Sequence, residues 1–551
     1  MIRAYLTDTL LSALERLSYA GVAELSFERT RQEHHGDLTT NIAFLLAKTV
    51  KKNPRAIAQE ILSAVSFDAS KIEKTEIAGP GFINITVSPS YYVNELRTIL
   101  ADGSSFGRGS SGKGRRAMVE YVSANPTGPL SVGHGRQAAI GDTLASFLEW
   151  QGYEVTREYY YNNAGRQMRV LASSTFARYR QLFDPSSPFP EDGYQGEYVT
   201  AVAEQIRTEV GDSLLARPEA EAEALCGKKA EEALFTSIRG VLERMGVKHD
   251  VYYNEDSLYT DGKVDEVVAA FRSKGLAYDK DGAVWLRATD LGLDQDRVII
   301  KNTGEPTYRL PDIAYHREKF LRGYDLIVDI FGADHIATIP DVLAGVEALG
   351  FDKQKVRVVI HQFVTLLRDG EQVKMSKRLA NFVTLDDLLE EVGSDAARYF
   401  FIMRSVGTHL EFDLNLAKEQ SEKNPVYYVQ YAHARIASIL RFAGTEGATK
   451  DEAEIGRASL GLLTGPSEVA LARTLLQFPD VVGHCATTLE PHRLPTYLHE
   501  VSTAFHKFYH DHRVVVEDAE VSRARLALCL CARTVLANGL GILGVTAPDR
   551  M

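Results

Sequence analysis

Apolar positions recur with helical spacing in the first 17 residues, MIRAYLTDTLLSALERL, and again in NIAFLLAKTVKKNPRAIAQEILSAV. Each pattern predicts amphipathic helix, and Pro54 divides the second segment into two helices. The following segment, IEKTEIAGPGFINITVS, predicts two strands joined by a turn at Gly-Pro-Gly. We therefore expect a small α+β domain at residues 1–105.

A Gly/Ser-rich segment from Asp102 to Gly114 predicts a flexible connector to a second domain. The apolar run RAMVEYV then predicts a buried strand, followed by the loop SANPTGPLSVGHGR and the helical pattern QAAIGDTLASFLEWQGY. Strand, glycine-bearing loop and helix form the opening unit of a doubly wound nucleotide-binding sheet. Two more candidate strands, YDLIVDIFG and KVRVVIHQF, extend it as a parallel sheet. We expect a Rossmann-type catalytic domain at 106–423, with an insertion at about 172–297.

From Asn424 onward the pattern is helical to the end, as in VYYVQYAHARIASILRF and RARLALCLCARTVLANGLGIL. This predicts an all-α C-terminal domain at 424–551. The expected fold class is thus α/β: a Rossmann-type parallel-sheet domain with an insertion, a small α+β N-terminal domain and an all-α C-terminal domain.

The composition narrows the class of protein. Hydrophobic residues make up 45% and charged residues 25% of the 551 positions, which excludes a disordered or fibrous chain. No run of about eighteen apolar residues predicts a membrane span. The four cysteines form neither a disulfide framework nor a paired metal motif, which favours a reducing cytoplasm and no structural metal. A net charge of −12 argues against a protein that grips nucleic acid by bulk positive charge, although residues 424–551 carry 12 basic and 13 acidic side chains.

The loop after the first strand of the second domain carries the first candidate chemistry. Gly133 and His134 open the following helix, where backbone amides and the helix dipole attract phosphate. A glycine lets the ligand approach the backbone closely, and a histidine there can donate to a phosphate oxygen during displacement. The alternative is a helix start with a solvent-facing histidine. The candidate loop comprises Ala124, Asn125, Pro126, Thr127, Gly128, Pro129, Leu130, Ser131, Val132, Gly133 and His134.

A second candidate lies in VKMSKRLANFVTL, where Lys374 and Lys377 flank Met375 and Ser376. Two ammonium groups at this spacing can hold β- and γ-phosphates and neutralise leaving pyrophosphate. The alternative is a solvated basic surface loop. Its position after the last predicted strand favours function, because loops at the carboxyl ends of parallel strands form the ligand crevice.

The two motifs together resemble those of the class I aminoacyl-tRNA synthetases. S-V-G-H, ending at His134, is similar to the H-I-G-H signature of that class, and K-M-S-K-R, beginning at Lys374, to its K-M-S-K-S. They occur in the same order, 240 residues apart. Further segments narrow the resemblance to the arginyl-tRNA synthetase family: EYVSANPTGPLSVGHGR, TREYYYNNAGRQM, PTYRLPDIAYH, FGADHI, KMSKRLANFVTL, DAARYFF, NPVYYVQYAHAR, and, nearer the ends, GDLTTNIAFLLAK, IAGPGFIN and RTVLANGLGILGVTAPDRM.

The resemblance implies that the chain ligates L-arginine to tRNA(Arg) through an arginyl-adenylate, with ATP supplied as its Mg²⁺ complex. It assigns charge stabilisation during adenylate formation to His134, Lys374 and Lys377. The implied ATP contacts are Gly133, His134, Gly332, Asp334, His335, Met375 and Ser376. The implied arginine contacts are Glu120, Asn125, Tyr308 and Asp312.

The chemistry of these arginine contacts suits a guanidinium, which is planar, permanently charged and best held by a carboxylate in bidentate geometry. Glu120 ends the first strand and is expected to face the crevice, and Asp312 follows Tyr308 by one helical turn. Asn125 would take the α-amino or carboxylate end of the substrate, and Tyr308 would flank the guanidinium. The alternatives are that Glu120 is a surface charge at a strand end, that Tyr308 packs on a helix face and that Asp312 is a solvated acid. The position of Asp334 is equally typical of a helix N-cap.

For tRNA, the resemblance implies contacts at Tyr431 and Met551 in the helical domain, where unpaired anticodon bases would be stacked, and at Asp37 and Asn41 near the N-terminus. Core packing explains Tyr431 as well, and caps or turns explain Asp37 and Asn41. We expect the enzyme to be a monomer that does not bind membranes.

Two positions depart from the family pattern. Ser131 stands where the family usually has histidine, and Asn163 where many members have aspartate. A serine hydroxyl can donate one hydrogen bond but cannot carry charge. The alternatives for the chain are another class I synthetase, for lysine or glutamine, a small-molecule nucleotidyltransferase, and a tRNA-binding paralogue that has lost catalysis.

Overall fold

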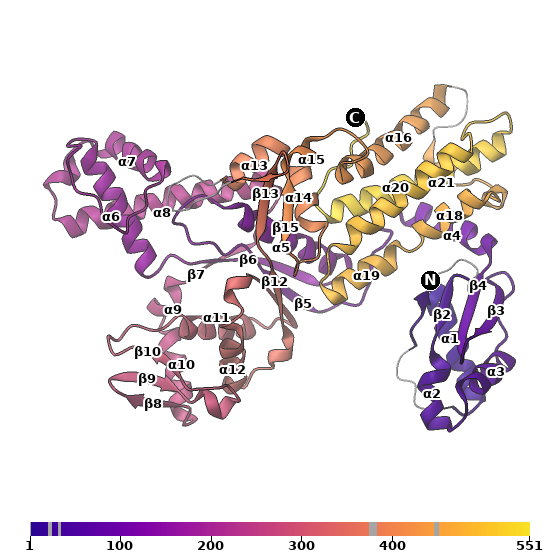
Figure 1. Ribbon diagram of the computed structural model, residues 1–551, viewed down its shortest axis with the longest axis horizontal. Helices are drawn as coiled ribbons and strands as arrows, with labels where there is room; N and C mark the ends of the chain where they lie inside the picture. The colour runs from indigo at the N-terminus through magenta and orange to yellow at the C-terminus, as the bar shows by residue number, and fades with distance from the viewer. Residues whose placement is uncertain (1, 20–24, 31–34, 374–382, 446–450) are drawn as a thin grey trace.

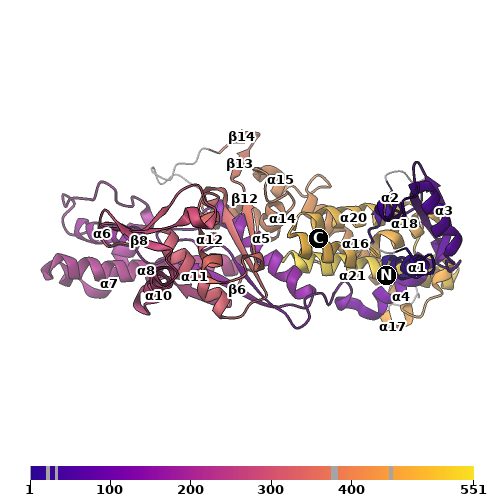
Figure 2. The ribbon, with the colours of Figure 1, turned by 90° about the horizontal axis from the view of Figure 1, so that it is seen from below.

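The computed structural model describes residues 2–19, 25–30, 35–373, 383–445 and 451–551. They form an elongated molecule with a parallel sheet near its middle (Figures 1 and 2). A three-helix unit projects at one end, and the N-terminal domain and the long C-terminal helices lie toward the other.

The N-terminal domain packs helices against a four-stranded antiparallel sheet of order β1-β2-β4-β3. The predicted helices and hairpin are confirmed. Pro54 is tolerated because it begins a helix, where the first N–H has no partner within the helix, and the Asn53 side chain caps that end. The elements are α1 (Ile2–Arg16), β1 (Glu28–Arg29), β2 (Leu38–Thr40), α2 (Ile42–Val50), α3 (Pro54–Ala64), β3 (Ile72–Ala78) and β4 (Phe82–Val87).

The segment 102–114, predicted as a flexible connector, is held in place. It follows α4 (Pro89–Asp102), which packs against the C-terminal helices α18 (Pro466–Leu475) and α21 (Ala519–Ile542). Gly112 N donates to the carbonyl oxygen of Gln151 at 2.8 Å. A Cβ at Gly112 would lie 1.9 Å from the Tyr153 ring. Glycine at position 112 therefore permits close packing here, so the prediction of a flexible connector was wrong.

The central sheet has five parallel strands in the order β12-β11-β5-β6-β7. The strands are β5 (Arg116–Glu120), β6 (Glu154–Tyr161), β7 (Val251–Asn254), β11 (Leu326–Gly332) and β12 (Val356–His361). The strands predicted from RAMVEYV, YDLIVDIFG and KVRVVIHQF are thus confirmed. The chain order reverses between β5 and β11, and the crevice at such a reversal, beyond the carboxyl ends of the strands, is where open α/β sheets bind ligands.

Helices cover both faces of this sheet. α5 (Val132–Trp150) packs on one face, where Val119 and Val328 are buried. α11 (Arg309–Leu321) and α12 (Ile339–Leu349) pack on the other, against Met118 and Ile327. Alternate residues of the same strand therefore belong to two separate cores, as in a doubly wound sheet.

The segment 172–297, predicted as one insertion, is interrupted by β7, which is an edge strand of the main sheet. Before β7 lies the three-helix unit of α6 (Arg166–Gln181), α7 (Glu197–Val210) and α8 (Glu219–Arg244). After β7 come α9 (Asp256–Thr260) and α10 (Lys263–Ser273), then an antiparallel sheet of β8 (Ala277–Lys280), β9 (Ala283–Leu286) and β10 (Arg297–Ile300). The second group packs with α11 beneath the main sheet.

A third small sheet follows β12. It contains β13 (Val364–Arg368), β14 (Glu371–Gln372) and β15 (Leu410–Asp413), with β13 and β15 parallel. The associated helices are α13 (Leu385–Val392), α14 (Ser394–Ile402) and α15 (Leu414–Lys418).

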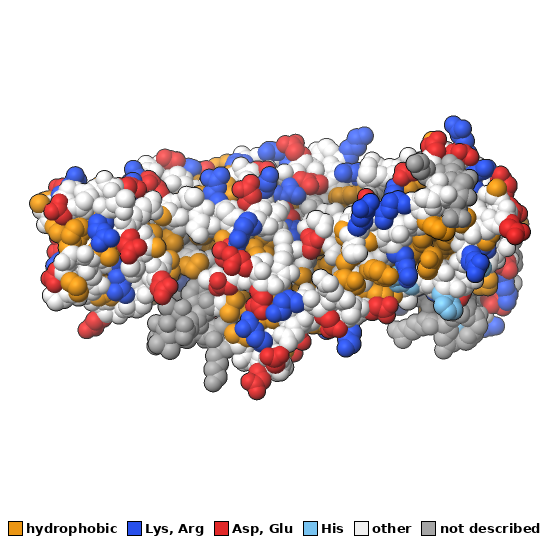
Figure 3. Space-filling view, turned by 90° about the horizontal axis from the view of Figure 1, so that it is seen from above, with side chains coloured by type: hydrophobic (Ala, Val, Ile, Leu, Met, Phe, Trp, Pro, Cys, Tyr) orange, Lys and Arg blue, Asp and Glu red, His pale blue; other side chains and the backbone are white. Residues whose placement is uncertain are grey.

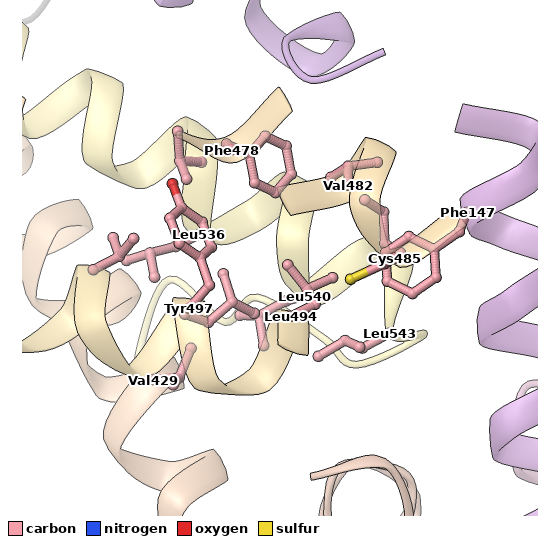
Figure 4. Close-up of a cluster of buried hydrophobic side chains, with 14 of the residues drawn as sticks. Phe147, Val429, Phe478, Val482, Cys485, Leu494, Tyr497, Leu536, Leu540 and Leu543 are labelled. Atoms are coloured by element: carbon pink, nitrogen blue, oxygen red, sulfur yellow. The ribbon is translucent and has the colours of Figure 1, made fainter. Parts of the chain in front are cut away.

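The C-terminal part is helical, as predicted: α16 (Pro425–Thr445), α17 (Glu452–Ile455), α18, α19 (Phe478–Thr488), α20 (Arg493–Asp511) and α21. Its core continues into the sheet domain, because Phe147 of α5 packs among buried residues of these helices (Figure 4). Among the described residues, α21 is the one helix long and apolar enough to cross a membrane, but 72% of its most apolar window is buried inside the protein. It therefore serves here as a core helix.

Candidate active site at the carboxyl edge of the parallel sheet

The strand-to-loop turn after β5 has a strained backbone. Val122 and Ser123 have φ values of 70° and 43°, a region that residues with a Cβ rarely adopt, least of all a β-branched valine. Ser123 Oγ donates to Glu120 Oε1 at 2.8 Å and accepts from Tyr160 N at 3.1 Å, which fixes the turn. Strain of this kind concentrates at ligand sites, where surrounding contacts can hold it.

The start of α5 is a reciprocal cap between Ser131 and His134. Ser131 Oγ accepts from His134 N at 3.5 Å, and His134 Nδ1 accepts from Ser131 N at 3.1 Å. With Nδ1 as an acceptor, a neutral His134 ring carries its proton on Nε2. Serine at the position where the family usually has histidine thus caps the helix and orients the remaining imidazole. A Cβ at Gly133 would meet no neighbour closer than 3.6 Å, so the backbone is open to a ligand there.

The second motif lies largely outside the described residues, so the structure does not place Lys374, Met375, Ser376 or Lys377. The chain just after it is placed. Thr384 forms an isolated antiparallel bridge with Ser131, and Leu385 N donates to the carbonyl oxygen of Leu130 at 2.8 Å. The end of VKMSKRLANFVTL is therefore bonded directly to the start of the signature helix, although the two are more than 240 residues apart.

The turn after β11 lies beside this helix. Gly332 ends β11 and pairs in register with His361, and Ala333, Asp334 and His335 form a 3-10 turn. The His335 ring stacks on Phe331 with centroids 5.6 Å apart, and the side chains of Asp334 and His335 are exposed. Asp334 makes no side-chain cap, so the N-cap alternative is wrong; its ATP contact stays a prediction.

Three carboxylates form a row across the sheet, which we call the sheet row: Glu120, Glu158 and Asp329 are register neighbours on β5, β6 and β11. All three are buried. Lys319 Nζ lies 2.5 Å from Glu120 Oε2 and 2.6 Å from Asp329 Oδ1. Negative charge in the sheet row is therefore balanced by a cation of the same protein.

The remaining members of the sheet row are also paired. Asp329 accepts from His316 Nε2 at 2.9 Å, and Glu158 accepts from Tyr315 Oη at 2.6 Å and from the Arg322 guanidinium. Although burial opposes it, Lys319 and His316 hold the pKa of Asp329 well below its usual range. Glu120 was predicted to face the crevice as a substrate ligand. It does end its strand there, but it is buried and both its oxygens are already engaged.

Two further carboxylates, Asp312 and Glu255, form no ion pair with a cation of the described residues, although Glu255 Oε1 accepts from Tyr259 Oη at 3.4 Å; we call them the open pair. Burial, reinforced by Glu120, raises the pKa of Asp312 to about 6. Burial and then the charge of Asp312 raise the pKa of Glu255 to about 7. Glu255 Oε2 and the neighbouring Tyr160 Oη are buried without a hydrogen-bond partner in the described structure. Such a pair favours a bound cation, because the cation would supply both the charge and the missing donors.

Glu255 was not predicted from the sequence. It follows the short strand β7, which was itself missed, and a carboxylate just beyond the aromatic run VYY was the available signal. The structure brings it together with Asp312, one turn into α11. Tyr308 precedes α11, but its side chain is 80% exposed, and its carbonyl oxygen rather than its phenol contacts Asp312. Asn125 Nδ2 donates to Gln167 Oε1 at 2.5 Å.

The departure at Asn163 has a clear structural setting. Asn163 Nδ2 donates to Glu231 Oε1 at 2.9 Å, and the same oxygen accepts from Tyr161 Oη at 2.8 Å. An aspartate at 163 would repel that carboxylate, so asparagine suits the glutamate of this chain.

The candidate tRNA residues near the N-terminus have structural contacts. Asp37 accepts from Val87 N at 2.8 Å and forms an ion pair with Arg473 of α18 at 3.0 Å, which joins the N-terminal and C-terminal domains. Asn41 stands before α2 without a side-chain cap. These contacts explain Asp37 as an interdomain bridge; an RNA role for either residue stays a prediction.

Tyr431 and Met551 line one hollow of about 650 Å³ on the C-terminal domain. Arg435 lies between two aromatic rings there, 5.2 Å from the Tyr431 centroid and 4.9 Å from that of Tyr509. In Figure 3, Lys and Arg side chains lie among hydrophobic ones over the C-terminal helices, with acids interspersed elsewhere on that face. Exposed aromatic and guanidinium planes of this kind suit stacking of unpaired bases.

Comparison with known families covers most of the chain. A model described as "Arginyl tRNA synthetase N terminal domain" matches residues 4–87. One described as "tRNA synthetases class I (R), catalytic domain" matches 95–403, and "DALR anticodon binding domain" matches 429–551.

Individual relatives agree with these matches. The arginine–tRNA ligase of Desulfotalea psychrophila is 52% identical over 531 residues, covering 96% of this chain and 95% of the relative. That of Chlorobaculum parvum is 46% identical over 555 residues and covers both chains completely. The structure of Thermus thermophilus arginyl-tRNA synthetase superposes over the full length of both chains with a TM-score of 0.79 at 22% identity, which supports the fold.

Proposed function

The chain belongs to the class I arginyl-tRNA synthetase family, and on this premise we propose that it ligates L-arginine to tRNA(Arg) at the expense of ATP. The observation that carries the choice of arginine is the open pair, Asp312 and Glu255, whose pKa values are raised and which form no ion pair within the described part of the chain. A guanidinium keeps its charge at any physiological pH and offers several planar donors, so it satisfies two carboxylates at once.

The proposed reaction has two steps. A carboxylate oxygen of arginine attacks the α-phosphorus of ATP, the bond to the bridging oxygen breaks, and pyrophosphate leaves with arginyl-adenylate formed. A terminal ribose hydroxyl of the tRNA then attacks the activated carbonyl; the C–O bond to the phosphate breaks, AMP leaves and the hydroxyl proton is released. No covalent enzyme intermediate is needed, so the protein contributes positioning and charge stabilisation.

We assign His134, Lys374 and Lys377 to stabilisation of charge on the phosphates. The Ser131 cap, which leaves His134 Nε2 as the donor, supports this role. Gly133, Gly332, Asp334 and His335, with Met375 and Ser376, would contact ATP. Mg²⁺ enters as part of the ATP complex and is a substrate component.

For arginine, we assign Asp312 and Glu255 to the guanidinium, Tyr308 to its flank, and Asn125 to the α-amino or carboxylate end. Glu120 would act mainly through its neighbours, because Ser123 and Lys319 occupy its oxygens. For tRNA, the hollow lined by Tyr431 and Met551 would receive anticodon bases. We further propose that the enzyme is a monomer and works in the cytoplasm.

The test is arginine-dependent exchange of pyrophosphate into ATP, together with charging of bulk tRNA, run in parallel with lysine and glutamine. We expect both activities with arginine alone. Charging with lysine or glutamine would favour another class I synthetase, and tight tRNA binding without charging would favour a paralogue that has lost catalysis; the family matches favour neither. Omitting tRNA tests the expectation that activation requires it. Retention of near-wild-type exchange by Lys377→Ala would remove that lysine from the mechanism.

A further inference from the structure

Arg136 lies on α5, two residues after His134, and its side chain is fully buried. Its guanidinium donates to three backbone carbonyl oxygens, those of Gln362 at 2.8 Å, Ser405 at 3.0 Å and Thr408 at 3.0 Å. Its Nε is buried without a hydrogen-bond partner in the described structure. A buried guanidinium held by carbonyls alone is unusual, because buried charges are normally paired with an opposite charge.

Two other guanidinium groups that contact α5 show the normal arrangement. Arg398, also fully buried, lies 2.5 Å from Asp142 Oδ2, and Arg157 lies 3.4 Å from Asp142 Oδ1 and also pairs with Glu149. Arg136 has no such partner in the described part of the chain. Burial lowers the pKa of Arg136 to about 10, so the group is still charged at neutral pH.

The helix dipole of α5 does not balance the charge of Arg136 either. Arg136 is in the second turn of α5, near the helix N-terminus, whose positive dipole cannot neutralise a cation. His361, beside it, adds no second positive charge, because burial and the nearby Arg136 lower the pKa of His361 to about 4 and keep that ring neutral. His361 pairs in register with Gly332 at the proposed ATP-side turn. A bound anion at this end of the sheet would balance the charge.

The three carbonyls give Arg136 a second role. Gln362 joins β12 to β13, and β13 runs toward the K-M-S-K-R segment. Ser405 and Thr408 precede β15, which pairs with β13. Arg136 therefore ties the signature helix to the chain just before β13 and β15.

We propose that Arg136 is a positioning residue for the triphosphate of ATP: its unneutralised charge favours the phosphates, and its three hydrogen bonds hold the chain before β13 and β15 against α5. The proposal rests on the proposed function and predicts that Arg136 affects ATP and pyrophosphate but not arginine. A residue that merely filled the core would affect all substrates together or only stability.

The experiment compares Arg136→Lys, which keeps the charge but loses the fork of donors, with Arg136→Met, which loses both. Arg157→Lys is the matched control, a partly buried arginine that contacts the same helix but is compensated. Arginine-dependent pyrophosphate exchange is measured with tRNA present and each substrate varied, and binding of inorganic pyrophosphate is measured by calorimetry. We expect kcat/KM for ATP to fall about tenfold in Arg136→Lys and about a hundredfold in Arg136→Met, with KM for arginine within about twofold of wild type. Pyrophosphate affinity should fall in the same order, and the control should change neither.

Parallel losses for arginine and ATP, or unchanged ATP kinetics and pyrophosphate affinity in both variants, would overturn the proposal. Failure of both variants to fold, judged by circular dichroism and thermal melting, would also overturn it, because Arg136 would then be a general core residue. Wild-type protein without arginine-dependent exchange would instead contradict the proposed function, and pyrophosphate binding would still test Arg136.

Discussion

The sheet row and the open pair place five carboxylates in one site, but only the sheet row is balanced within the chain. Lys319, His316 and Arg322 compensate Glu120, Glu158 and Asp329. Asp312 and Glu255 form no ion pair with a cation of the described residues, and the pKa of each is raised.

The comparison separates a structural acid from a ligand-binding one. A carboxylate whose partners lie in the protein fixes the geometry of the strands, and it has little left for a substrate. A buried carboxylate that is not paired with a cation destabilises the free protein. Binding of a cation offsets that cost in free energy. Position at a strand end does not distinguish a structural carboxylate from a ligand-binding one, whereas the presence or absence of a cationic partner does.

The largest effect is expected from Lys319→Met. It removes the shared cation of the sheet row and leaves Glu120 and Asp329 buried and unpaired, which should lower the free energy of unfolding by about 3–5 kcal/mol. Denaturant unfolding monitored by fluorescence measures this. Lys263→Met is the control, because its partner Glu318 lies on the same helix but the lysine is partly exposed; a loss as large there would contradict the account.

Asp312→Asn should act with the opposite sign on stability. It removes half of the open pair, so kcat/KM for arginine should fall about 10²–10³-fold while the free energy of unfolding rises by about 1–2 kcal/mol. Pyrophosphate exchange and denaturant unfolding measure the two effects. Glu318→Gln, a carboxylate on the same helix that is paired with Lys263, should leave arginine kinetics unchanged. A destabilised Asp312→Asn protein would mean that Asp312 has a compensating partner.

Glu255→Gln should have a smaller effect, about 10–100-fold on kcat/KM for arginine. With a pKa of about 7, Glu255 is only partly ionised in the free enzyme at neutral pH, so part of its attraction is already lost. The same exchange assay checks this, with KM for ATP as the internal reference. If Glu255→Gln loses as much kcat/KM for arginine as Asp312→Asn at pH 8 but less at pH 6.5, the result agrees with this explanation. A loss in kcat/KM that is greater at pH 6.5 than at pH 8 would contradict it.

The smallest effect is the pH dependence of the wild-type enzyme. Because the folded pKa values of Asp312 and Glu255 are raised to about 6 and 7, their protons must leave before a guanidinium binds. At saturating ATP, kcat/KM for arginine should therefore fall about tenfold from pH 8 to pH 6. For stability the sign is reversed: these groups favour the folded state at low pH and lose that contribution as pH rises through 4 to 7. Glu255→Gln should remove the part of the pH dependence of kcat/KM for arginine that lies near pH 7.

Much of the fold follows from local pattern. The apolar runs at β5, β11 and β12 and the helical periodicity after Asn424 indicate their elements directly. β7 was missed because four residues, VYYN, are too few for a periodic signal, and its place in the sheet depends on contacts with β6. The Gly/Ser segment before β5 was misread because small residues serve close packing as well as flexibility.

The candidate site was predicted less completely, for a physical reason. Glu120 and Asp312 were found by family motif, but whether a carboxylate is compensated depends on distant residues. Lys319, 199 positions after Glu120, decides its role, and β7 brings Glu255 to Asp312. Charge balance is a property of the folded chain, and no spacing in the sequence reveals it.

Citrulline provides the most direct test of the open pair, since it has the shape of arginine but a neutral urea in place of the guanidinium. Calorimetric titration of each amino acid into wild-type enzyme and Asp312→Asn, with tRNA present, compares the two affinities. We predict that wild type prefers arginine by at least about a hundredfold and that the variant narrows this preference to less than about tenfold. An unchanged preference in the variant would show that the uncompensated charge of Asp312 does not select the substrate.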